Sequence, residues 1–279
     1  MLGKLFKYDF KSMIRFWWIA ALAVTGLSVV GGFAFTAINS DKNLPGSVYV
    51  VLYMVLMLIY FAFIAFGILS VVSIFVRFYK NFFSDEGYLT FTLPVKKTHL
   101  LNSKILSATL LEIITGAVIY ANIFIIICIT FAKDIFTTQF INEFIDGITE
   151  IFAEATVSDI VYLVVWFIEI CAILLLSSLF SLLLLYLCIT LGSIITKKAR
   201  VVVAIAIYYG VVNVLTFIIY ILLLFGIESA VIWISDIPEA VGPLILTLIF
   251  FAIILLMSAI CMLMYTLEYR MLDKKLNLS

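Results

Sequence analysis

Long apolar runs dominate the pattern of hydrophobic and polar positions along this chain of 279 residues. Six runs are long enough to cross a hydrocarbon core of about 30 Å, which takes about 20 residues in a helix. They cover Phe16–Ile38, Val48–Val76, Ile105–Phe131, Ile160–Ile195, Val201–Phe225 and Val241–Leu267. None shows the alternation of a membrane barrel strand, and lipid offers the backbone no hydrogen-bond partner. The pattern therefore predicts an all-α polytopic membrane protein with six transmembrane helices.

Three further segments have patterns of their own. Residues 1–15 place basic and apolar side chains on opposite faces, which predicts an amphipathic interfacial helix before the first span. Residues 226–243 are apolar but interrupted by Pro238, Gly242 and Pro243, which favours a re-entrant or interfacial hairpin. Residues 132–159 are predicted to form an outer amphipathic insertion that lies on the membrane or caps the bundle. Its apolar positions are Phe140, Ile141, Phe144, Ile148, Ile151 and Phe152, and its acidic positions are Glu143, Asp146, Glu150 and Glu154.

Composition agrees with a membrane protein, and charge predicts its orientation. Hydrophobic residues make up 66% of the chain and charged residues 12%, whereas about 25% charged is usual for soluble domains. Of the 17 basic residues, all but Lys42 and Lys133 fall on one side of the six runs. Basic residues collect on the cytoplasmic side, so we expect both termini in the cytoplasm. The acidic face of 132–159 would then be outside, where it either attracts cationic substrates or keeps the segment solvated.

Motifs for catalysis and metal binding are missing from the sequence. There is no P-loop to hold a nucleotide, and the single histidine, His99, has no HExxH context. The four cysteines, Cys128, Cys171, Cys188 and Cys261, all fall within apolar runs without Cys-x-x-Cys spacing. We therefore expect neither a catalytic site, a metal site nor a cofactor in this chain, and no nucleic-acid partner.

Two acidic residues fall inside predicted spans. Glu112 lies early in the third and Glu169 in the outer part of the fourth, where a charge costs about 2.5 to 3.5 kcal/mol on insertion scales. One interpretation places both in a polar substrate path. In the other, Glu112 reaches toward Lys104 or Arg77 at the membrane boundary, and Glu169 is protonated and bonded to a neighbouring hydroxyl.

The segment Ser84–Lys104, between the second and third spans, has chemistry that spanning a bilayer does not require. Ser84 and Asp85 are good helix N-cap residues, and Pro94 ends the element. Aromatic and apolar side chains between them form either a knob for docking a protein or a surface folded against the membrane.

The string SDEGYLTFTLPVKKTHLLNSKIL resembles the segment between the second and third spans of ABC transporter permeases of the type-2 exporter family, especially small Gram-positive-type bacterial ones. The resemblance implies one permease domain over 1–279, with a coupling-helix loop at 77–104 that docks into a separate ATPase subunit. It also makes 1–15 the connecting helix and 226–243 an outer gate. The coupling-helix contacts would be Asp85, Glu86, Gly87, Tyr88, Leu89 and Phe91, with Pro94 as terminator.

In such a complex, the partner ATPase would bind ATP and Mg, and a second copy or a homologous permease would complete a dimer in the bacterial cell membrane. Amphipathic or hydrophobic substrates are expected, with peptides or antimicrobials favoured by the resemblance. The insertion 132–159 is longer than in a minimal family member. Small residues at Ser28 with Gly32 and at Ser177 with Ser181 are candidate packing seams, within one subunit or between two.

Two other function classes stay open. A stand-alone ion-coupled secondary transporter would use Glu112 and Glu169 near the midplane of the membrane, although no internal repeat is evident. An intramembrane enzyme would lose activity when either acid is replaced, and it would not need the loop.

Overall fold

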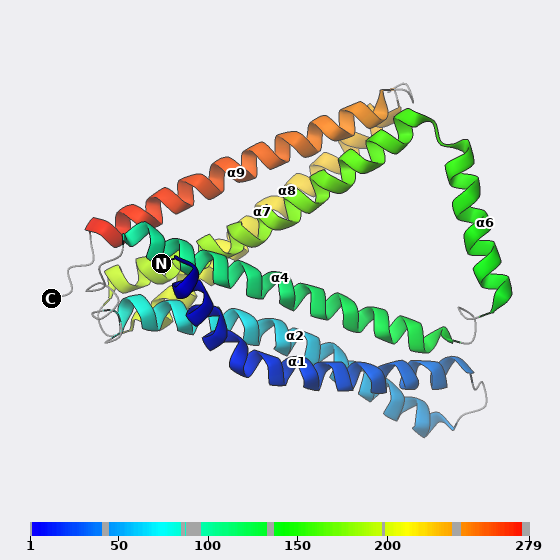
Figure 1. Cartoon of the computed structure of the whole chain (residues 1–279), viewed down its shortest axis with the longest axis horizontal. Helices are drawn as coiled ribbons and strands as arrows, with labels where there is room; N and C mark the ends of the chain where they lie inside the picture. Colours follow the sequence, from blue (N-terminus) through cyan, green and yellow to red (C-terminus); the bar gives the residue numbers. More distant parts are fainter. Residues whose placement is uncertain are drawn as a thin grey trace. The chain divides into compact units, whose positions relative to one another are not determined.

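The computed structural model describes residues 2–40, 45–84, 87, 96–132, 137–196, 199–235 and 241–274. Within these ranges there are seven helices and no strand (Figure 1). The helices are α1 (Leu2–Ser40), α2 (Gly46–Phe83), α4 (Lys97–Thr130), α6 (Thr138–Glu154), α7 (Val157–Ile195), α8 (Arg200–Ser235) and α9 (Gly242–Lys274). All except α6 are long and apolar enough to cross a membrane. The prediction of an all-α polytopic membrane protein with six spans is confirmed.

The chain forms two compact units, each built from two stretches of sequence. Unit 1 contains Met1–Arg77 and Leu106–Ala155, and unit 2 contains Phe78–Ile105 and Thr156–Ser279. The bodies of α2 and α4 therefore belong to unit 1 together with α1. The end of α2 and the beginning of α4, which flank the predicted docking loop, belong to unit 2 together with α7, α8 and α9. That the whole chain is one permease domain stays a prediction.

In unit 1, α1 packs against both α2 and α4, and Figure 1 shows the three helices side by side. The indole of Trp17 is buried, lies 5.5 Å from the ring of Phe66 on α2, and donates a 2.9 Å hydrogen bond to Thr115 Oγ1 on α4. A buried stripe runs along α1 at spacings of three and four. Its members are Asp9, Met13, Trp17, Ala21, Val24 and Ser28.

The predicted seam at Ser28 and Gly32 packs α1 within its own chain. Ser28 is fully buried, and a Cβ on Gly32 would lie 2.7 Å from Cβ of Ile129 on α4. That separation is below any real carbon–carbon contact, so only glycine lets the two helices approach this closely. Close packing of α1 against α4 within one subunit therefore explains the small residues at these two positions.

The beginning of α1 differs from the separate interfacial helix predicted for residues 1–15. Helix α1 runs without interruption from Leu2 to Ser40, since the sequence has no glycine or proline between Gly3 and Gly26. The helix bends near its dark blue beginning (Figure 1). Asp9 and Met13 are buried, so this face of the amphipathic segment contacts protein.

The hairpin predicted for 226–243 also differs from the structure over its first ten residues. Helix α8 continues through Gly226 to Ser235, and residues 236–240 lie outside the described part. A single glycine inside a helix costs only about 1 kcal/mol relative to alanine, so Gly226 does not end α8. The next helix breaker in the sequence is Pro238.

Helix α6 (Thr138–Glu154) lies within the insertion at 132–159, whose outer location stays a prediction. Its apolar face is exposed, with Phe140, Phe144 and Ile148 at 42%, 60% and 39%.

Thr156 and Asp159 form a capping box that begins α7, with the Thr156 backbone N–H donating to Asp159 Oδ2 at 2.9 Å. The cap satisfies backbone groups that the first turn leaves unpaired.

In unit 2, α7 packs against α8 and α9, as Figure 1 shows. A Cβ on Gly192 would lie 2.8 Å from the backbone nitrogen of Ala204, so α7 and α8 meet backbone to backbone. Large side chains near the end of α7 form the core of this unit, and they include Leu182, Leu183, Leu184, Leu185 and Tyr186.

Candidate docking site at the ends of α2 and α4

Of the residues predicted to form the coupling helix, the structure describes Gly87. The others, Asp85, Glu86, Tyr88, Leu89, Phe91 and Pro94, lie outside the described residues. Gly87 is buried, and its backbone N–H donates a 2.7 Å hydrogen bond to the carbonyl of Ser84. A Cβ at this position would lie 2.8 Å from the carbonyl oxygen of Phe82. The tight turn after α2 therefore needs glycine here.

One side chain of α7, Tyr186, contacts both flanks of this loop. Its ring stacks on Phe78 near the end of α2, with centroids 3.8 Å apart and planes 7° from parallel. Its hydroxyl donates a 3.3 Å hydrogen bond to the carbonyl of Lys104 in the first turns of α4. Tyr186 is 2% exposed. The last turns of α2 and the first turns of α4 therefore contact the same buried side chain.

Helices α8 and α9 each add a contact to the flanks. Arg200, the first residue of α8, donates from Nη1 to the carbonyl of Phe83 at 3.1 Å. This carbonyl belongs to the last turn of α2, where a helix has unpaired acceptors and favours a positive charge. Tyr265 on α9 donates a 2.8 Å hydrogen bond to Asn102 Oδ1 on α4. Sequence patterns did not indicate these three partners, because each lies far from the loop in sequence.

A buried acid near the end of α9 is another feature that the apolar runs do not predict. Glu268 is fully buried, and Thr190 on α7 donates a 2.6 Å hydrogen bond to its Oε1. Glu268 comes one residue after the predicted end of the last span, at Leu267. Its spacing of seven from Cys261 and four from Leu272, both buried, was a signal that it shares their helix face.

The two predicted intramembrane acids belong to different units, Glu112 to unit 1 and Glu169 to unit 2. Both are half-buried. Among the described residues, Glu169 Oε2 is enclosed and has no hydrogen-bond partner, and neither has the indole nitrogen of Trp166 one turn earlier on α7. Polar atoms enclosed without a partner are costly and mark places where a ligand, ion or water is worth seeking.

Arg77, one of the two cations suggested as partners of Glu112, forms an ion pair with Asp9. Its Nη2 lies 3.2 Å from Asp9 Oδ1, and the aspartate side chain is 4% exposed. Asp9 is the only acid in the first 40 residues and lies four positions before Met13. The pair fixes the beginning of α1 to the last turns of α2 within unit 1.

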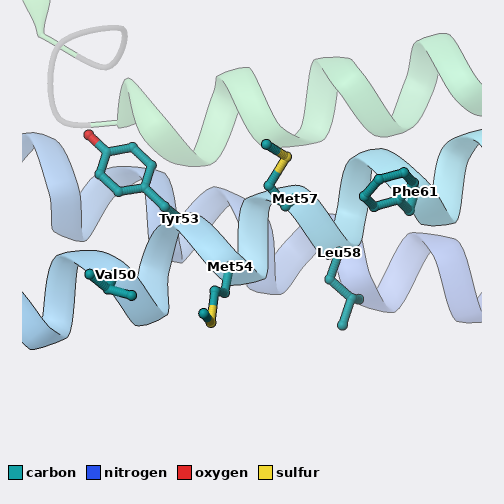
Figure 2. A pocket seen from close by; sticks show the side chains of 6 residues that line it. All are labelled: Val50, Tyr53, Met54, Met57, Leu58 and Phe61. Carbon is teal, nitrogen blue, oxygen red and sulfur yellow. The ribbon is translucent and has the colours of Figure 1, made fainter.

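A shallow hollow of about 580 Å³ lies along one face of α2. Figure 2 shows its lining side chains projecting from that helix. They are Val50, Tyr53, Met54, Met57, Leu58 and Phe61. The Tyr53 hydroxyl is the one polar side-chain group among them. The surface suits lipid or another apolar group and offers no acid, base or nucleophile.

Among the described residues, no three His, Cys, Asp or Glu side chains lie close enough to hold a metal ion. Comparison of the chain with protein-family models, with curated proteins and with solved structures finds no match.

Proposed function

We propose that this protein is the transmembrane permease subunit of an ATP-driven exporter, and that a separate ATPase subunit docks on the loop between α2 and α4. The substrate would be amphipathic or hydrophobic, with a peptide or antimicrobial favoured. The observation that carries the proposal is the support of the loop at both ends. Tyr186 contacts the Phe78 ring before it and the Lys104 carbonyl after it.

Such support suits an element that receives force from a partner. A loop whose ends were held by unrelated parts of the protein would deform under load, whereas this one has both flanks on one buried tyrosine. The resemblance of residues 84–106 to a coupling segment agrees with this use. So do the six helices able to cross a membrane.

The experiment is a pull-down of the tagged chain from its native membrane, followed by an ATPase assay. The test variant is Tyr88→Ala/Phe91→Ala in the loop. The matched control is Phe140→Ala/Phe144→Ala, which removes two aromatic side chains from the exposed face of α6. We expect an ATPase subunit with the wild type and the α6 variant, and at least a tenfold lower yield with the loop variant, which is about 1.4 kcal/mol of binding free energy.

Recovery of no ATPase with the wild type in mild detergent would reject the proposal. An ion-coupled transporter would then be the second candidate, because the enclosed Glu169 Oε2 has no partner among the described residues. In that case Glu169→Gln should abolish pH-driven substrate movement in proteoliposomes, whereas Glu150→Gln on the exposed α6 should not.

A further inference from the structure

Residues 78–105 belong to the same compact unit as α7, α8 and α9. Each of these three helices contributes one side chain to the flanks of the loop, namely Tyr186, Arg200 and Tyr265. The flanks of the loop are therefore joined to side chains that lie 82 residues or more further along the sequence than their partners.

We propose that Tyr186 is the positioning residue through which a movement of the docking loop is passed to α7. The inference rests on the proposed function, because it assumes that an ATPase subunit moves the loop. Arg200 and Tyr265 keep the loop's flanks against α8 and α9, while Tyr186 connects both flanks to one helix at once.

Tyr186 is suited to this role because its contact with Phe78 and its contact with Lys104 differ in kind. The ring stack on Phe78 holds two aromatic faces against each other and resists their separation. The bond from its hydroxyl to the Lys104 carbonyl is directional, so it opposes sliding of α4 past α7. Tyr186→Phe removes the hydroxyl that bonds to the Lys104 carbonyl and keeps the ring, whereas Tyr186→Leu removes the hydroxyl and the aromatic stack on Phe78 together.

A native cysteine can report the movement. Cys188 lies two residues after Tyr186 on α7 and is 2% exposed, so alkylation of its thiol requires this part of α7 to open. Replacement of Cys128, Cys171 and Cys261 by alanine leaves Cys188 as the one cysteine. N-ethylmaleimide then measures the opening in proteoliposomes that contain this chain and the ATPase subunit purified with it.

The measurement is the alkylation rate with ATP and vanadate divided by the rate without nucleotide. In the otherwise unchanged chain we expect the ratio to differ from one by about threefold or more, because a buried thiol reacts through local opening. The ratio should move most of the way back to one in Tyr186→Phe and reach one in Tyr186→Leu. Tyr162→Phe, the same substitution elsewhere on α7, should keep the full response.

Docking and folding are measured in parallel. The proposal requires Tyr186→Phe to retain the bound ATPase and a melting temperature close to that of the parent chain while the nucleotide response falls. A merely structural tyrosine would lower the melting temperature and leave the response of the folded fraction intact. If Tyr186→Leu does not fold, the nucleotide response of Cys188 alkylation in Tyr186→Phe still decides the test.

Two results would overturn the inference and leave the proposed function standing. In one, the ATPase binds the parent chain but nucleotide does not change Cys188 alkylation. In the other, both Tyr186 variants respond as the parent chain does. Failure to recover any ATPase with the wild type would instead remove the proposed function, and this inference with it.

Discussion

Glu268 shows how a single buried polar side chain joins two helices. Its carboxyl group is enclosed near the end of α9, and the Thr190 hydroxyl on α7 donates to one oxygen at 2.6 Å. A bond to a carboxyl group in such an environment is worth more than one at a surface, since losing a partner leaves a buried polar atom unpaired. Glu268 and Thr190 are therefore expected to stabilise the contact between α7 and α9.

We predict that Glu268→Ala lowers the free energy of unfolding by about 1 to 3 kcal/mol, because it leaves the Thr190 hydroxyl without this acceptor and opens a cavity. Glu268→Gln keeps an acceptor oxygen and should lose less. Thermal unfolding in detergent, followed by size-exclusion chromatography, measures the difference. Glu150→Gln on exposed α6 is the control and should melt as the wild type does. Equal losses in Glu268→Gln and Glu268→Ala would show that the hydrogen bond is not the cause.

Buried polar residues were the hardest to predict from the sequence. Glu112 and Glu169 stand out in the sequence because they interrupt apolar runs, yet both are half-buried, whereas Glu268, which lies just beyond a run, is fully buried. Burial depends on the helix that packs alongside, and that neighbour comes from a distant part of the sequence. Asp9 was overlooked for the same reason, since its partner is Arg77, 68 residues away.

Helices are the elements that the sequence predicted best, because apolar length alone identifies them. All six predicted runs lie largely within helices that the structure contains. Their ends were less predictable. Helix α1 begins at Leu2 and α8 ends at Ser235, because helical geometry continues past the apolar run until a glycine, a proline or a cap stops it.

The contact between α1 and α4 gives a sharp test at this scale. We predict that Gly32→Ala destabilises the protein by about 1 to 3 kcal/mol, because its Cβ would overlap Ile129 and force the helices apart. Gly26→Ala on the same helix is the matched control, since nothing lies within 4 Å of a Cβ at that position. There the higher helix propensity of alanine should leave stability unchanged or slightly raised.

Thermal melts of both glycine variants in the same detergent make this comparison. Equal melting temperatures for Gly32→Ala and Gly26→Ala would mean that α1 and α4 do not approach as closely as described.

For the whole molecule, the distribution of charge predicts an orientation. All but two of the 17 basic residues fall on the side of the six spans that contains both termini and the loop between α2 and α4, and basic loops stay in the cytoplasm. We predict that, in a chain with its four native cysteines replaced by alanine, Thr138→Cys on α6 reacts with a membrane-impermeant maleimide in intact cells. Ala199→Cys, before α8, should react only after the cells are opened.

Both positions are exposed in the structure, so access across the membrane is what differs between them. Labelling of Ala199→Cys in intact cells, with Thr138→Cys protected, would reverse the orientation and place the docking loop outside, away from any cytoplasmic ATPase.

The division of the chain into two units was beyond prediction from the sequence. Hydropathy places each span but not its neighbours. Two of the three boundaries between the units fall inside helices, within α2 and within α4, and only the third lies at a connection, between α6 and α7. Phe78 and Lys104 lie in stretches that look like ordinary helix ends. Tyr186 looks like one more apolar position in a leucine-rich run.

The double contact of Tyr186 limits how the loop can be exchanged with that of another protein. A graft confined to residues 85–95 would keep the native flanks, Phe78 and Lys104, and should preserve the fold. A longer graft over 78–104 would replace both flanks. Its own residues would then have to fit against Tyr186 on α7 and, to a lesser degree, against Arg200 and Tyr265. Engineering a new recipient for this loop therefore involves five helices, because α7, α8 and α9 contact the flanks, although the exchanged sequence joins only α2 and α4.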